Sequence, residues 1–163
     1  MYRSSIVFGV ISGSTAIIGI IATIVFEVAY QWLGYLIMLI AFTAIYIALL
    51  RYREDIQGGV MKFATGLKLG GSITGIASLA YVFGWEMYLL VTDYSFATEY
   101  MDAVIEAERA SGASEAEIAT LAADMTNFQE SYGNPLFRTA VTFTEIFPVG
   151  LLVSLVSATL LRK

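Results

Sequence analysis

The chain contains no cysteine and no histidine among its 163 residues, and only two prolines. Without cysteine and histidine the chain lacks thiolate nucleophiles, disulfides, imidazole bases and the usual zinc and haem ligands. We therefore expect no cofactor and no metal site. Charged residues are also scarce: they make up 14% of the chain, against about 25% in soluble domains. Hydrophobic residues account for 58%, so lipid is the expected solvent.

Long stretches separate the few charges, two of them interrupted by a single glutamate, and each matches the roughly 20 apolar residues that a helix needs to cross a bilayer. The stretches are continuous rather than alternating, which favours helices over barrel strands. The predicted fold class is all-α. We expect a single membrane domain over residues 1–163, a bundle of four transmembrane helices with an extracytoplasmic amphipathic helical hairpin between helices 3 and 4. The predicted spans are about 4–26, 31–50, 66–92 and 136–161, and the hairpin segment is 93–134.

Charge and aromatic residues predict the orientation of these spans. Lys and Arg favour the cytoplasmic side of short loops. If the spans alternate, seven basic residues share one side: Arg3, Arg51, Arg53, Lys62, Lys68, Arg162 and Lys163. Segment 93–134 has nine acidic residues and only Arg109 to oppose them. We expect both termini in the cytoplasm, the short turn from Glu27 to Trp32 outside, and an outer aromatic belt of Tyr30, Trp32, Tyr35, Trp85, Tyr88 and Tyr94.

The segment 93–134 reads as two amphipathic helices. One open interpretation is that the third span continues outward as the first of them, and Ser111-Gly112 ends this helix. Ser114 with Glu117 has the spacing of a capping box at the start of the second helix. Asn134 and Pro135 then predict the N-cap and first residue of the last span.

Small residues recur at four-residue spacing in the first and third spans. Such spacing lets helix backbones approach closely in lipid. The predicted helix-packing residues are Gly9, Gly13, Gly66, Gly70, Gly71 and Gly75. Two interpretations stay open, which are packing within one bundle and a homo-oligomer interface.

Two carboxylates within the spans are candidates for an activity. Carboxylates in spans are costly and usually face a bundle interior or a wet cavity. Glu86 and Glu145 each lie about 10 Å below the outer edge, and we expect Arg138 to be the counter-charge of Glu145. With Thr142 and the helix-bending Pro148 they form a candidate intramembrane polar site. This set either binds an ion or proton, or holds helices 3 and 4 in register.

No P-loop, nucleophile elbow, zinc-protease motif or dinucleotide fingerprint is present. Nor is there a basic stripe for nucleic acid. The expected partners are membrane lipid and either a second copy or another membrane protein. Three hypotheses follow: a non-enzymatic accessory or scaffold subunit that forms oligomers, a small proton-linked transporter or channel using Glu145, and a membrane-embedded enzyme acting on lipid.

Five sequence patterns resemble a bacterial membrane-protein family, the domain-of-unknown-function family numbered 4199. They are Trp32-Leu33-Gly34-Tyr35, Arg51-Tyr52-Arg53, Gly84-Trp85-Glu86-Met87-Tyr88, Asn134-Pro135-Leu136-Phe137-Arg138 and Glu145-Ile146-Phe147-Pro148-Val149-Gly150. The resemblance covers essentially the whole chain, with the weakest match from Ala97 to Ala123. It implies a small bacterial inner-membrane protein with four spans, and it implies no activity, substrate or cofactor.

Overall fold

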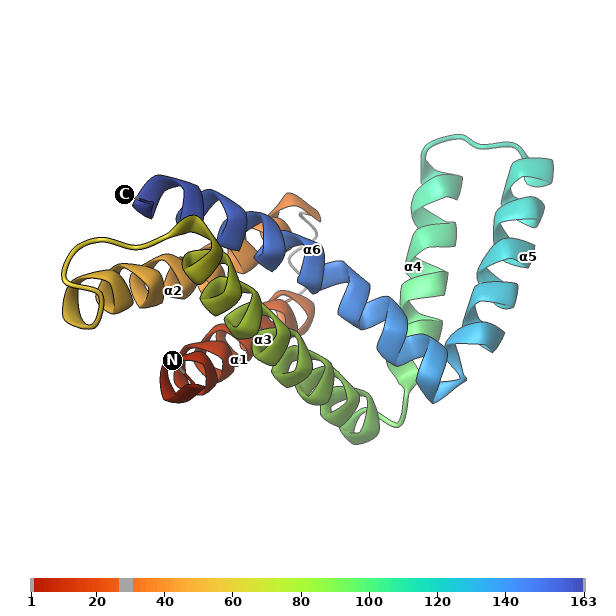
Figure 1. Ribbon diagram of the computed structural model, residues 1–163. Coiled ribbons are helices and arrows are strands. Elements are labelled where there is room, and N and C mark those ends of the chain that lie inside the picture. The colour runs from red at the N-terminus through yellow and green to blue at the C-terminus, as the bar shows by residue number, and fades with distance from the viewer. Residues whose placement is uncertain (1, 27–30, 163) are drawn as a thin grey trace. The chain divides into compact units, whose positions relative to one another are not determined.

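All regular secondary structure in the described part of the chain is helical, which confirms the predicted fold class. A computed structural model describes residues 2–26 and 31–162. Within these ranges the helices are α1 (Tyr2–Val25), α2 (Gln31–Asp55), α3 (Phe63–Val91), α4 (Ser95–Ala110), α5 (Glu115–Tyr132) and α6 (Pro135–Leu161) (Figure 1). Four of these, α1, α2, α3 and α6, are long and apolar enough to cross a membrane.

The chain divides into two compact units, Met1–Trp85 with Thr142–Lys163, and Glu86–Val141. We call the first the span unit and the second the hairpin unit. The span unit contains α1, α2, most of α3 and most of α6. The hairpin unit contains α4 and α5 with the adjoining ends of α3 and α6.

Glycines set the contacts between helices in the span unit. A Cβ added to Gly9 would lie 2.7 Å from Cβ of Ile76, and one added to Gly84 would lie 2.9 Å from Ile17. These two contacts advance together along both helices, so α1 and α3 run parallel. Between α3 and α6, Gly70 lies against Ser154.

Helix α6 runs antiparallel to α3, because Gly66 lies against Ala158 and the later residue Thr74 lies against the earlier Gly150. Thr74 and Ser154 also share a hydrogen bond between their hydroxyls, with the oxygens 3.0 Å apart. The starts of α1 and α3 and the end of α6 therefore lie at the same end of the span unit.

Large apolar side chains lie both inside the span unit and on its exterior. Phe42, Ile45 and Leu49 are fully buried, whereas Ile18 and Phe83 are about two-thirds exposed. A water-soluble protein of this size would cover most such side chains. An apolar exterior all round is the pattern of a helix bundle in lipid, so the protein is a multi-pass membrane protein.

The helix ends differ from the predicted spans in places. Helix α2 continues past residue 50 to Asp55, and α3 begins at Phe63 rather than residue 66. Charged residues end an apolar stretch without ending a helix, because Arg and Glu are good helix formers. The predicted turn at residues 27–30, including Tyr30, lies outside the described residues.

The predicted aromatic belt is only partly exposed. Trp32 and Tyr35 are more than half exposed, as expected for side chains at an interface. Trp85 is only 7% exposed, so its side chain packs against other parts of the protein rather than facing outward. Sequence position places a side chain along a helix, whereas packing decides the side to which it points.

The third span does not continue into the hairpin, which decides against the interpretation of one continuous helix. Helix α3 ends at Val91, and Asp93 and Tyr94 adopt left-handed backbone conformations, with φ of 49° and 57°. The Tyr94 N–H donates to the Leu89 carbonyl, with an N···O distance of 2.8 Å. Neither residue is glycine, so the turn carries steric strain of about 1 kcal/mol or more for each residue.

The two predicted helix starts are present. Ser114 and Glu117 form the capping box of α5, and the Glu117 carboxylate accepts from the Ser114 N–H at 2.8 Å. The Asn134 side chain accepts from the Leu136 N–H at 2.9 Å, one residue after α6 begins at Pro135. Both caps satisfy N–H groups that the helix itself leaves unpaired.

Candidate functional site

Arg138 forms a two-pronged ion pair with Glu86 within the hairpin unit. Its Nε donates to Glu86 Oε1 at 2.8 Å, and its Nη2 donates to Oε2 at 2.7 Å. The two residues lie 52 positions apart in sequence. The Arg138 side chain is 4% exposed and that of Glu86 is 24% exposed. This parallel geometry is among the strongest that an ion pair adopts, particularly where water is excluded.

Two tyrosines complete the surroundings of this guanidinium. Its Cζ lies 5.0 Å from the centre of the Tyr94 ring and 5.8 Å from that of Tyr132, both within cation–π range. Nη1 also donates to the Tyr132 carbonyl at 3.1 Å. We call Glu86, Tyr94, Tyr132 and Arg138 the arginine cluster.

The arginine cluster draws together four separate parts of the chain. Glu86 lies near the end of α3, Tyr94 in the left-handed turn before α4, Tyr132 at the end of α5, and Arg138 in the first turn of α6. Both ends of the α4–α5 hairpin therefore meet at one guanidinium. The contact with the Tyr94 ring also offsets part of the strain of its backbone.

The expected pairing of Arg138 with Glu145 is not what the structure shows. Arg138 uses Glu86 as its counter-charge, and the Glu145 carboxylate forms no hydrogen bond or ion pair with any other described residue. Seven residues along a helix correspond to about 10 Å, whereas a carboxylate on an adjacent helix can meet the guanidinium directly.

The rest of the predicted polar site divides between two faces of α6. Thr142 is buried, as are Ile146, Gly150 and Ser154, which lie on one side of the helix. Glu145 and Pro148 are exposed on the other side. Helix α6 continues through Pro148. The structure thus brings Glu86 and Arg138 together, and it places Glu145 on an outer face of the span unit.

The six predicted packing glycines fall into two groups. Gly9, Gly13, Gly66 and Gly70 each lie so close to a neighbouring helix that a Cβ would meet an atom at about 3 Å or less. At Gly71 and Gly75 an added Cβ would meet nothing within 4 Å.

Gly71 and Gly75 lie on the open side of α3. Beside it is a hollow of about 530 Å³. Its lining is Ser5, Ile6, Ser72, Gly75, Ile76, Leu79 and Phe143.

The predicted topology anchors are mostly exposed charges. Arg51, Lys62, Lys68 and Arg162 all face outward. Arg53 is half-buried and its Nη2 lies 2.9 Å from a carboxylate oxygen of Glu54. Lys163 lies outside the described residues.

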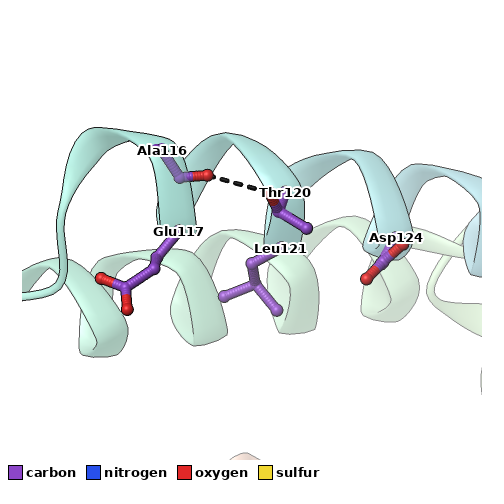
Figure 2. A pocket seen from close by; sticks show the side chains of 5 residues that line it. All are labelled: Ala116, Glu117, Thr120, Leu121 and Asp124. Atoms are coloured by element: carbon purple, nitrogen blue, oxygen red, sulfur yellow. Dashed lines mark hydrogen bonds between the residues drawn. The ribbon is translucent and has the colours of Figure 1, made fainter.

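A second, open hollow of about 400 Å³ lies along α5. Figure 2 shows Glu117, Leu121 and Asp124 directed to the same side of this helix, as their spacing requires. Hydrogen bonds from Ser114 hold the pKa of Glu117 below its ordinary value, so this carboxylate stays ionised at neutral pH. Across residues 2–26 and 31–162, no three acidic side chains gather closely enough to hold a metal ion.

Sequence reasoning missed Tyr94 and Tyr132 as partners of Arg138. The only local signal was that each lies at a predicted end of a helix, where tyrosine is also common as an interfacial residue. A pairing across 44 residues, as for Tyr94, or 52 residues, as for Glu86, has no sequence period, so neither contact of Arg138 could be found from spacing alone.

Comparison with known proteins identifies a family. A family model described as a protein of unknown function, DUF4199, matches residues 7–163, which is nearly the whole chain. No curated protein matches, and no solved structure matches.

Proposed function

The chain belongs to the DUF4199 family of proteins of unknown function, and on that premise we propose that it is a non-enzymatic accessory or scaffold subunit that forms homo-oligomers. The open face of α3 carries this proposal. Gly71 and Gly75 are spaced as in close-packed membrane helices, and yet no other described residue fills the space above them.

The surroundings of Gly71 and Gly75 suit a second copy of α3. The hollow beside Gly75 is a concave surface, and Leu79 one turn further along projects with 63% of its area exposed. Copies inserted in the same orientation are related by a two-fold axis along the membrane normal, which makes their α3 helices parallel. Each copy would then place its Leu79 beside the hollow of the other.

The test is the oligomeric state of full-length protein in lipid nanodiscs or mild detergent. We expect a dimer for the natural protein, measured by light scattering and by energy transfer between labelled copies. Gly75→Leu should fill the close-contact position and reduce association by about tenfold, the order of a single well-packed helix interface. A combined Gly71→Leu and Gly75→Leu variant should be monomeric.

Ala140→Leu is the matched control, because Ala140 is an exposed small residue elsewhere on a span. This variant should associate like the natural protein. A natural protein that is monomeric at all lipid ratios, or a dimer that the glycine variants leave intact, would show that the open face of α3 has no such role.

We place the protein in the bacterial inner membrane, with both termini cytoplasmic and segment 93–134 outside. The basic residues at the ends of the spans support this orientation. The directions of α1, α3 and α6 agree with it, since they place the start of α1 and the end of α6 at one end of the span unit.

The alternative function, a proton-linked transporter using Glu145, requires that carboxylate to line a path. Glu145 instead lies on the side of α6 opposite Ile146, Gly150 and Ser154, which are buried. A position on an outer face favours contact with another molecule over conduction through this bundle.

A further inference from the structure

The outer face of α6 has an unusual composition for a surface in lipid. Glu145, Pro148, Leu152 and Val156 are all exposed and follow one another at spacings of three and four residues. The opposite side of the helix, from Ile146 to Ala158, packs inside the span unit. We call the exposed set the Glu145 face.

The Glu145 carboxylate lies well inside the span. It is ten residues after Pro135 and sixteen before Leu161, which places it about 15 Å from the nearer end of α6. No other described residue forms a hydrogen bond or ion pair with it, and the nearest basic residue in the sequence, Arg138, is committed to Glu86. A carboxylate at this depth facing hydrocarbon is costly, and such groups are normally paired.

From this arrangement we propose that the Glu145 face docks a membrane-spanning helix of another protein, one that presents a basic side chain to Glu145. The proposal rests on the accessory-subunit function above, and it specifies the chemistry of the partner. Leu152 and Val156 supply the apolar surface along which such a helix packs, and Glu145 supplies the charge that selects it.

A basic helix fits this face better than a second copy of the chain does. Two copies meeting here would bring two carboxylates together, which disfavours their ionised forms. A lysine or arginine restores neutrality at the same depth, and arginine can engage both carboxylate oxygens at once. The self-association proposed above uses the open face of α3, on a different helix.

The test uses a leucine-rich transmembrane peptide with one arginine at its centre as the probe. Full-length protein is labelled at a single cysteine introduced at exposed Ile56, since the natural chain has none. Energy transfer to the labelled peptide is measured in liposomes. We expect the arginine peptide to bind about tenfold more tightly than the same peptide with leucine or aspartate in place of arginine.

Three variants decide whether Glu145 is responsible. Glu145→Gln should lower binding of the arginine peptide to the level of the leucine peptide, and Glu145→Asp should retain part of the preference. Glu106→Gln, which removes the same charge from the exposed surface of α4, should bind like the natural protein. Circular dichroism and gel filtration check that each variant is folded.

Equal binding of the arginine, leucine and aspartate peptides by the natural protein would overturn the proposal without any variant. So would an arginine preference that survives Glu145→Gln, or one that Glu106→Gln abolishes equally. The combined Gly71→Leu and Gly75→Leu variant, which is expected to be monomeric, separates this proposal from self-association. If this monomer still prefers the arginine peptide, docking at the Glu145 face does not depend on the dimer.

Discussion

At the scale of single residues, Arg138 has the largest structural role in the hairpin unit. Its guanidinium neutralises the Glu86 carboxylate and donates to the Tyr132 carbonyl. It also lies against the Tyr94 ring, and this contact helps to hold the strained turn before α4. Removing either partner of such a pair leaves an uncompensated charge in a low-dielectric setting. Replacing both partners by apolar side chains removes the charges together.

We expect Arg138→Gln or Glu86→Gln to lower the free energy of unfolding by about 3 kcal/mol. The double variant Glu86→Met with Arg138→Met should lose less than either single variant, because no unpaired charge remains. Equilibrium unfolding in mixed micelles with increasing denaturing detergent measures these differences. Glu106→Gln serves as the control and should fall within about 0.5 kcal/mol of the natural protein. Additive losses in the double variant would contradict a coupled pair.

At the scale of secondary-structure elements, α5 depends on its first turn. In the described structure Ile118 is its only buried residue, so packing contributes little to the stability of this helix. The capping box of Ser114 and Glu117 therefore carries an unusual share of its stability.

This dependence predicts a loss of order in α5 on acidification. The pKa of Glu117 is lower in the folded hairpin than in an unfolded chain because of its hydrogen bonds to Ser114. A group of this kind stabilises the fold fully above its unfolded pKa, about 4.3. That contribution is lost as the pH falls through the lower folded value. Amide hydrogen exchange at Glu117 and Ile118 in nanodiscs should accelerate between about pH 5 and pH 3 after correction for intrinsic rates.

Glu117→Gln, which removes the titrating carboxylate, should exchange faster at neutral pH and show little further change on acidification. Ser111→Ala provides the comparison, since the Ser111 hydroxyl donates to the Glu108 carbonyl and takes no part in the capping box. If Glu117→Gln keeps the pH response of the natural protein, other carboxylates of the hairpin are responsible for it.

At the scale of the whole molecule, the proposed orientation places the loop after α2 and the tip of the hairpin on opposite sides of the membrane. Gln57 and Ser111 are exposed residues of these two segments. The chain contains no cysteine, so a single introduced one gives an unambiguous signal.

In intact bacterial spheroplasts, a membrane-impermeant maleimide should label Ser111→Cys and leave Gln57→Cys unlabelled. Both variants should react after the membrane is opened with detergent, which controls for reactivity. The expected difference in labelling is at least about tenfold. Labelling of Gln57→Cys in sealed spheroplasts would reverse the proposed orientation.

Several features of this protein follow from the sequence because they depend on neighbouring residues. Long uncharged stretches predicted the all-α fold with four apolar helices, and the patterns around Trp32, Glu86 and Arg138 led to the family that the comparison confirms. The capping box at Ser114 and the start of α6 at Pro135 were likewise predictable. For these two helix starts the stabilising contact lies within four residues, where helix geometry sets the distance.

Only the folded structure decided how each helix is rotated about its axis and which residues meet across helices. Gly70 packs against Ser154 while adjacent Gly71 is open, and Glu145 points away from the bundle while adjacent Ile146 is buried. The pairing of Arg138 with Glu86 likewise depends on how α3 and α6 are rotated about their axes. In lipid both sides of a span are apolar, so hydrophobic periodicity cannot indicate the rotation, and close packing between helices decides it.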